Sequence, residues 1–146
     1  MKELVLADLS SLDRFGRMVK SFSEGASRNT SIEILTAGGT YLFLIGRPGL
    51  AALLGLPKTL SKMKQLHLDH CGLNDDNIPA LASILKETKL ECLSLVGNMA
   101  ITSQGWSIFS EALVGHTSLE RLGLRSNSIG DDGAIKFAGA LKENTT

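Results

Sequence analysis

Leucines recur along the chain in short groups in which every second position is apolar. The clearest group contains Leu119, Leu122 and Leu124, and it is followed by Asn127 and Ile129. Alternation of apolar and polar residues predicts a short strand with one buried face, because successive side chains of a strand point to opposite sides of the sheet. We therefore expect a strand that starts just after residue 119 and buries its leucines.

The same group occurs at regular intervals, so the chain is built from repeats. Close copies begin at Met63 and Leu90, and fainter copies begin at Met1 and Ile32. Successive copies start about 27 to 31 residues apart, which is the range of a strand–helix repeat. We expect a single domain whose units span residues 1–31, 32–62, 63–89, 90–118 and 119–146.

The second half of each unit has the pattern of a helix with one apolar side. Three units contain an apolar pair four residues apart: Leu81 and Leu85, Phe109 and Leu113, and Phe137 and Leu141. Residues at this spacing lie on the same side of a helix, so each pair is expected to face the core. Asp131 and Asp132 precede the last pair, where negative charge favours a helix N-terminus.

These motifs resemble those of the leucine-rich repeat family, in particular its long-repeat, ribonuclease-inhibitor-like class. They follow the pattern L-x-x-L-x-L-x-x-(N/C)-x-L and continue into a helix, most closely over residues 63–143. Cys71 and Asn98 alternate at the polar position, which is typical of that class. The first two units depart from the pattern, because Leu9 and Thr40 occupy this position.

The resemblance implies an α/β solenoid, a curved stack of strand–helix units with a parallel sheet on the concave face. Parallel strands lie about 4.8 Å apart, whereas helix axes need about 8–10 Å, so such a stack bends with its strands inside. The amides of Asn98 and Asn127 are expected to bond backbone groups that no ladder reaches. Cys71 is expected to fill the same position as a small buried residue.

The resemblance further implies a protein-interaction scaffold or adaptor that binds a partner protein on the concave face. Two alternatives stay open: a regulator of an enzyme, of the inhibitor or GTPase-activating type, and the sensor region of an immune-receptor-like protein. The outward-pointing residues of the three clearest strands are the candidate partner-binding residues: Gln65, His67, Asp69, Ser94, Val96, Arg121 and Arg125. The two arginines suit either an acidic patch of a partner or a solvated charged face.

One cluster on this face suggests catalysis. His67, Asp69 and Ser94 are expected side by side, so a hydrolase that uses them is a remote alternative. His67, Asp69 and His70 also hold potential metal-ligand atoms, but His70 should point to the other side of the strand. Exposed strands often bring such residues together without a pocket. We therefore expect no enzymatic activity, no catalytic residue, no cofactor and no metal.

Composition narrows the range of partners. Lysine and arginine number 15 and aspartate and glutamate number 15, so no net charge attracts nucleic acid or an anionic membrane. The apolar stretch from Tyr41 to Leu56 is too short to span a bilayer. Two cysteines cannot form a disulfide framework, and residues 1–8 lack the pattern of a secretory signal. These features favour a cytoplasmic protein with reduced thiols.

Two further expectations concern packing and the chain ends. Trp106 follows Gly105 at the start of a predicted helix, and we expect a partly buried packing residue there. The sequence stops just after a helix at Asn144 without capping residues. Stacks of repeats usually need caps. The chain is therefore expected either to be a segment of a longer array or to have its ends covered by a partner or by a second copy.

Overall fold

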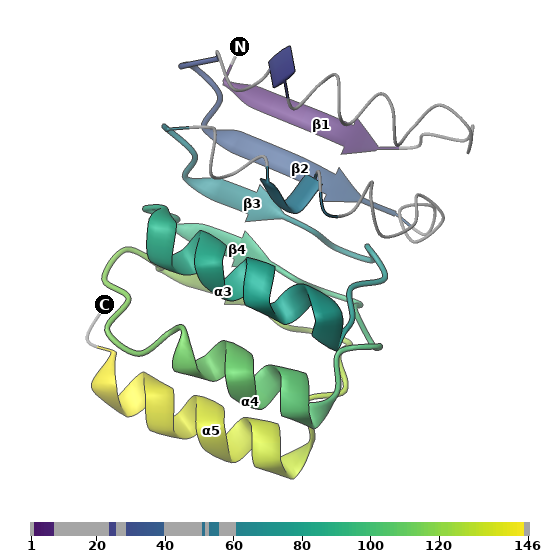
Figure 1. Cartoon of the computed structure of the whole chain (residues 1–146), viewed down its shortest axis with the longest axis vertical. Helices are drawn as coiled ribbons and strands as arrows, with labels where there is room; N and C mark the ends of the chain where they lie inside the picture. The colour runs from purple at the N-terminus through teal and green to yellow at the C-terminus, as the bar shows by residue number, and fades with distance from the viewer. Residues whose placement is uncertain are drawn as a thin grey trace.

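A parallel sheet forms one layer of the molecule (Figure 1). The computed structural model describes residues 2–7, 24–25, 29–39, 51, 53–55 and 61–144. Within them, five strands lie in the order β1-β2-β3-β4-β5. Their bounds are β1 Glu3–Ala7, β2 Ile34–Gly38, β3 Gln65–His67, β4 Cys92–Ser94 and β5 Arg121–Gly123. Each strand begins two residues after a predicted unit start, so the sheet repeats in the register of the sequence.

Helices form the second layer. A 3-10 helix, η2 (Asp75–Asn77), leads into α3 (Ile78–Glu87), and α4 (Ser103–Glu111) and α5 (Gly130–Glu143) follow the next two strands. The three α-helices lie side by side on one side of the sheet (Figure 1). Asp131 and Asp132 lie in the first turn of α5, as predicted. Strand and helix therefore alternate in these units, which confirms the predicted α/β architecture.

The core lies between the two layers and is built from aligned leucines. The register pairs one leucine of each strand with the next: Leu4, Leu35, Leu66, Leu93 and Leu122. The three central members of this row are buried, whereas those on the edge strands β1 and β5 are partly exposed. Full burial of one leucine side chain contributes about 1.5–3 kcal/mol to folding. Repetition of this row across the sheet therefore stabilises the stack.

Polar side chains join neighbouring units where each chain segment leaves its strand. Asn98 is fully buried; its Oδ1 accepts hydrogen bonds from the backbone N–H groups of Cys71 and Leu73, both at 3.1 Å. Its Nδ2 donates to the carbonyl oxygens of Leu68 and Leu95, both at 2.9 Å. The predicted role of Asn98 is thus confirmed, and its amide replaces four backbone partners that the strands do not supply.

The equivalent residues on either side act in the same way. Asn127 accepts a hydrogen bond from the backbone N–H of Asn98 at 2.9 Å and donates to the Leu95 and Leu124 carbonyls. Cys71 is buried, and its Sγ donates to the Ala37 carbonyl oxygen at 3.1 Å. Burial raises the pKa of the Cys71 thiol to about 12, so the sulfur keeps the proton that it donates.

Trp106 is more deeply buried than the sequence suggested. Its side chain is fully buried and meets Phe109 edge to face at 5.7 Å between ring centroids, with Phe137 at 6.0 Å. The expectation of partial burial is wrong because α5 packs directly over α4, and Gly133 lets the two helices approach closely at Trp106. Within the described residues, the indole Nε1 has no hydrogen-bond partner.

The last unit is less covered than the others. Leu85 and Leu113 are 1% and 2% exposed, but Leu141, predicted to take the same place in α5, is 60% exposed. The difference arises because no described element packs on the outer side of α5. The expectations for Leu9 and Thr40, and most of the apolar stretch 41–56, lie outside the described residues. None of the described helices has the length and apolar character needed to span a bilayer.

Candidate protein-binding surface

Two rows of side chains run across the face of the sheet that lies opposite the helices. We call this surface the strand face. The strand register aligns its first row as Glu3, Ile34, Gln65, Cys92 and Arg121, and its second row as Val5, Thr36, His67, Ser94 and Gly123. Because these positions alternate with the buried leucines, they point away from the core. Side chains distant in sequence thus form one continuous surface.

A third row, formed by Asp69, Val96 and Arg125, continues the surface beyond the strand ends. Three backbone hydrogen bonds keep the neighbouring segments parallel there: Gly39 N–H to the Asp69 carbonyl, His70 N–H to the Val96 carbonyl and Gly97 N–H to the Arg125 carbonyl. The structure therefore brings together all the predicted partner-binding residues. Gln65, His67, Asp69, Ser94 and Val96 are partly exposed, whereas Arg121 and Arg125 are exposed.

Asp69 connects two units within this surface. Its Oδ1 accepts a hydrogen bond from Ser94 Oγ at 2.5 Å and another from the Val96 backbone N–H at 2.9 Å. Gly123 leaves room for this arrangement, since a Cβ there would come within 2.8 Å of Ser94 Oγ. Asp69 thereby holds the segment after β4 against the segment after β3.

The same bonds bear on the remote hydrolase alternative. The Ser94 hydroxyl donates to the Asp69 carboxylate and not to His67, and the His67 side chain forms no hydrogen bond within the described part of the chain. His70 lies in the turn after β3 with φ +56°, and no three His, Cys, Asp or Glu side chains of the described residues are grouped as a metal site. A nucleophile paired with a histidine base is therefore not formed here.

Some members of the strand face were not predicted. Ile34, Thr36, Val5 and Glu3 belong to the two faint units, and Cys92 belongs to the unit that starts at Leu90. Val5 is 53% exposed, and Cys92 is a free, partly exposed cysteine beside Arg121. The unit starts contain the signal that identifies these residues, because each first-row residue lies two positions after a start.

A ladder of charges borders the strand face where the strands begin. The Lys2 Nζ lies 3.8 Å from Glu33 Oε1, and the Lys64 Nζ lies 2.9 Å from Glu91 Oε1. The hydrogen bond to Glu91 is the main cause that raises the pKa of Lys64. Glu120 takes the next position in the β4–β5 register and is exposed. The signs along the ladder therefore alternate up to Glu91 and then repeat.

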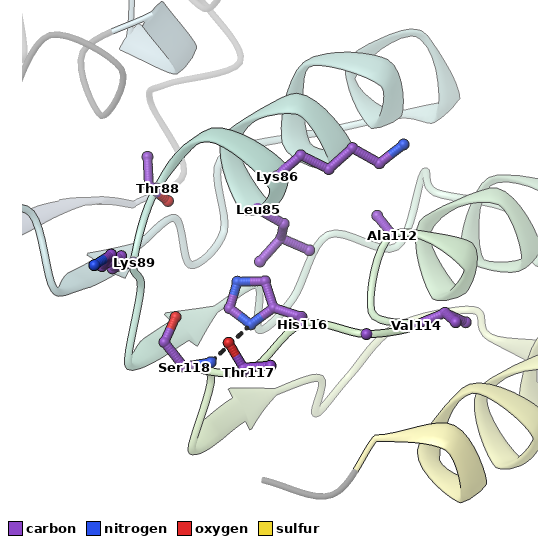
Figure 2. Close-up of a pocket in the computed structure, with 10 residues that line it drawn as sticks. Leu85, Lys86, Thr88, Lys89, Ala112, Val114, His116, Thr117 and Ser118 are labelled. Carbon is purple, nitrogen blue, oxygen red and sulfur yellow. Dashed lines mark hydrogen bonds between the residues drawn. The ribbon is translucent and has the colours of Figure 1, made fainter.

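A pocket of about 440 Å³ lies on the helix layer, around His116 (Figure 2). The His116 Nδ1 accepts hydrogen bonds from the backbone N–H groups of Ser118 at 3.4 Å and Leu119 at 3.1 Å. Burial lowers the pKa of His116, although a backbone hydrogen bond with Leu85 opposes the shift. Lys86 also lines the pocket, next to the C-terminal end of α3, where a cation complements the helix dipole. His116 thus serves the turn into β5, because its Nδ1 accepts these two backbone hydrogen bonds.

Comparisons with known proteins agree with this architecture. A family model described as a leucine-rich repeat matches residues 115–138. No curated protein matches the chain. Among solved structures, the chain is similar to the tropomodulin C-terminal domain of Caenorhabditis elegans, with a TM-score of 0.69 and 16% identity; the match covers 98% of this chain and 83% of that one.

Two further solved structures are similar. Leiomodin-1 actin-binding site 2 has a TM-score of 0.68 and 16% identity over 98% of this chain and 80% of that chain. A chain of the yeast complex of Rad7 and Elc1 has a TM-score of 0.59 and 18% identity over 92% of this chain and 34% of that chain. At these identities the similarity concerns the fold: the chain is an α/β solenoid of the leucine-rich-repeat type, as predicted.

Proposed function

We propose that this chain is a protein-interaction module that binds an acidic surface of a partner protein on its strand face, and that it acts by binding rather than by catalysis. The observation that carries the proposal is the exposed pair Arg121 and Arg125. Arg121 begins β5 and Arg125 follows its end, and neither forms an ion pair within the described residues. Arginine is enriched among residues that dominate binding energy in interfaces.

The rest of the face supports the same role. Gln65, His67 and Val96 present polar and apolar atoms on the same face as the arginines, and the sheet holds them in fixed register. A rigid surface loses little conformational entropy when it binds. The spacing difference between strands and helices would make this face concave, as in the long-repeat, ribonuclease-inhibitor-like class to which we assign the chain.

The similar structures add support from their own partners. One of them is described as an actin-binding site of leiomodin-1, and another belongs to a complex of Rad7 with Elc1. Leucine-rich-repeat folds thus serve in protein binding, although the identity of a partner does not transfer at this level of similarity. An adaptor and an enzyme regulator would use the same face, so the nature of the bound protein distinguishes these two roles.

Affinity capture with matched variants tests the proposal. The wild-type chain, the double variant R121E/R125E and the control K62E/K136E serve as baits. Both variants change the net charge equally, but Lys62 and Lys136 lie outside the rows of the strand face. We expect a defined protein that the wild type and the control retain, and that R121E/R125E binds at least about tenfold more weakly.

Three results would count against the proposal. Equal retention by all baits would place binding elsewhere, and no retention by any bait would remove the evidence for a partner. Hydrolysis of an ester by the purified chain, abolished in His67→Ala, would support the hydrolase alternative instead. A captured GTPase whose hydrolysis rate rises on binding would identify an enzyme regulator that uses the same surface.

A further inference from the structure

The two edges of the sheet are complementary in their backbone groups. In β5, the Arg121 N–H donates to the Glu91 carbonyl and the Gly123 carbonyl accepts from Leu95. The backbone groups of Leu122 and Leu124 therefore point away from β4, to an edge at which no described strand pairs, which we call an open edge. In β1, the Lys2 carbonyl accepts from Ile34, so the backbone groups of Glu3 and Val5 point to the opposite edge, at which no described strand pairs either. Unpaired edge groups can template the addition of another strand.

An apolar groove of about 700 Å³ lies beside the open edge of β5. Its lining includes the partly buried Leu122 and Leu124, together with Phe137 and the 60% exposed Leu141 of α5. In the preceding unit, the equivalent space beside β4 and α4 is filled by side chains of the next unit, β5 and α5. The groove is the same space in the last unit. It therefore fits another strand with inward leucines at the same spacing.

The charges beside β5 specify which strand fits. Along the ladder at the strand starts, lysine and glutamate alternate as Lys2, Glu33, Lys64 and Glu91, and Glu120 then follows with the same sign as its neighbour. A lysine beyond Glu120 would place an opposite charge next to this glutamate. In the first row of the strand face the exposed end residue is Arg121, for which a neighbouring glutamate is the matching partner.

The β1 strand of this same chain has these residues in the required order. If β1 of a second copy lies parallel to β5 in the register found between β4 and β5, then Lys2 lies beside Glu120 and Glu3 lies beside Arg121. Leu4 then extends the leucine row that ends at Leu122, and Leu6 comes to lie beside Leu124. One register thus satisfies two charge pairs and two apolar contacts.

We infer that copies of this chain associate head to tail, with β1 of one copy added in parallel to β5 of the next. The alternative two-fold arrangement of β5 against β5 is less favourable. Its antiparallel strands would bring Arg121 of the two copies to diagonal positions on one face, where like charges repel. The head-to-tail contact is heterologous, so it leaves one free edge of each kind and permits longer oligomers or a ring.

Sedimentation velocity of the purified chain over a range of concentrations tests this inference. We expect association that increases with concentration and that each single charge reversal, E3R or R121E, weakens about tenfold. Because Glu3 and Arg121 would meet across the contact, an equimolar mixture of the E3R and R121E chains should associate again. Every contact between unlike chains in that mixture joins opposite charges.

Controls separate the contact from the fold and from the proposed partner site. The reversals E111R and K136E, on exposed residues of the helix layer, should leave self-association unchanged, and circular dichroism should show equal thermal unfolding for all variants. The measurement contains no partner protein, and Glu3 belongs to the edge strand farthest from the two arginines. Failure of the strand-face proposal would therefore not affect the result.

Specific outcomes overturn the inference. If the chain stays monomeric at millimolar concentration, the inference is wrong, because the open edges then do not attract one another. Oligomers that resist E3R but respond to R121E would indicate a β5–β5 contact. A mixture of E3R and R121E that remains monomeric would show that Glu3 and Arg121 do not meet.

Discussion

Cys71, Asn98 and Asn127, which bond backbone groups between neighbouring units, form what we call the polar ladder. Replacement of Asn98 by alanine should destabilise the chain more than any other single change in this ladder. The fully buried amide accepts hydrogen bonds from the backbone of Cys71 and Leu73 and donates to the carbonyls of Leu68 and Leu95. Asn98→Ala leaves three of these backbone groups without a partner in a site that is closed to solvent, because the Leu95 carbonyl still accepts a hydrogen bond from Asn127 Nδ2. Each buried unsatisfied group costs about 1–3 kcal/mol.

The sum over three groups gives an expected loss of about 3 kcal/mol or more in the free energy of unfolding. Domains of ordinary stability have a free energy of unfolding of about 5–15 kcal/mol, so such a loss approaches the whole stability of a weak fold. Equilibrium urea denaturation, followed by far-ultraviolet circular dichroism, measures it. The urea midpoint should fall sharply, and the slope of the transition should stay the same if the variant keeps two-state unfolding.

Two matched variants decide whether buried hydrogen bonds are the cause. Asn127→Ala removes the equivalent amide, but Asn127 is partly exposed, so water can replace its bonds and the loss should be about 1–2 kcal/mol. Asn98→Cys introduces the residue found at the Cys71 position and should recover part of the loss, because a thiol can donate one bond. A loss below about 1 kcal/mol for Asn98→Ala, or one no larger than that for Asn127→Ala, would refute the reasoning.

Other parts of the structure lead to further predictions. Burial lowers the pKa of His116, and its Nδ1 accepts two backbone bonds. The contribution of His116 to the free energy of unfolding should therefore be fully present above the unfolded-state pKa of about 6.5 and should fall as the pH drops below it. His116→Asn should keep the turn and flatten that dependence in pH-resolved thermal unfolding, since Asn29 Oδ1 accepts the equivalent bonds in an earlier unit. A maleimide should label the partly exposed Cys92 in the native chain and spare Cys71, whose buried thiol has a pKa of about 12; mass spectrometry that finds equal labelling would contradict the assigned burial. Gly97→Ala should cost at least about 2 kcal/mol in urea denaturation, because φ is +73° and the added Cβ would meet the His70 ring; an unchanged midpoint would contradict this.

Local periodicity made most of the architecture predictable. The pattern of leucines located the five strands, and the positions of Asn98 and Cys71 identified residues that bond backbone groups between units. Each of these properties depends on residues within one unit, because side-chain direction in a strand follows from alternation alone. The candidate surface could be predicted in the same way, since its members alternate with the buried leucines.

The hydrogen-bond and ion-pair partners within that surface could not be predicted from the pattern. Ser94 was expected beside His67, and it is, but its hydroxyl donates to Asp69. The pairs Lys2–Glu33 and Lys64–Glu91 also join different units. Such contacts depend on how far each strand is shifted relative to its neighbour and on which rotamers fit, and alternation within one unit contains neither quantity.

The sequence by itself determined the repeat, the strand positions, the polar ladder and the set of side chains that faces away from the core. Only the tertiary structure decided that Trp106 is fully buried beneath α5, that Leu141 is exposed although Leu113 is not, and that Glu3 and Arg121 occupy the same row at opposite edges. The physical reason is the range of the interactions. Alternation within a unit selects the face of each side chain, whereas burial and pairing depend on whether another unit lies alongside.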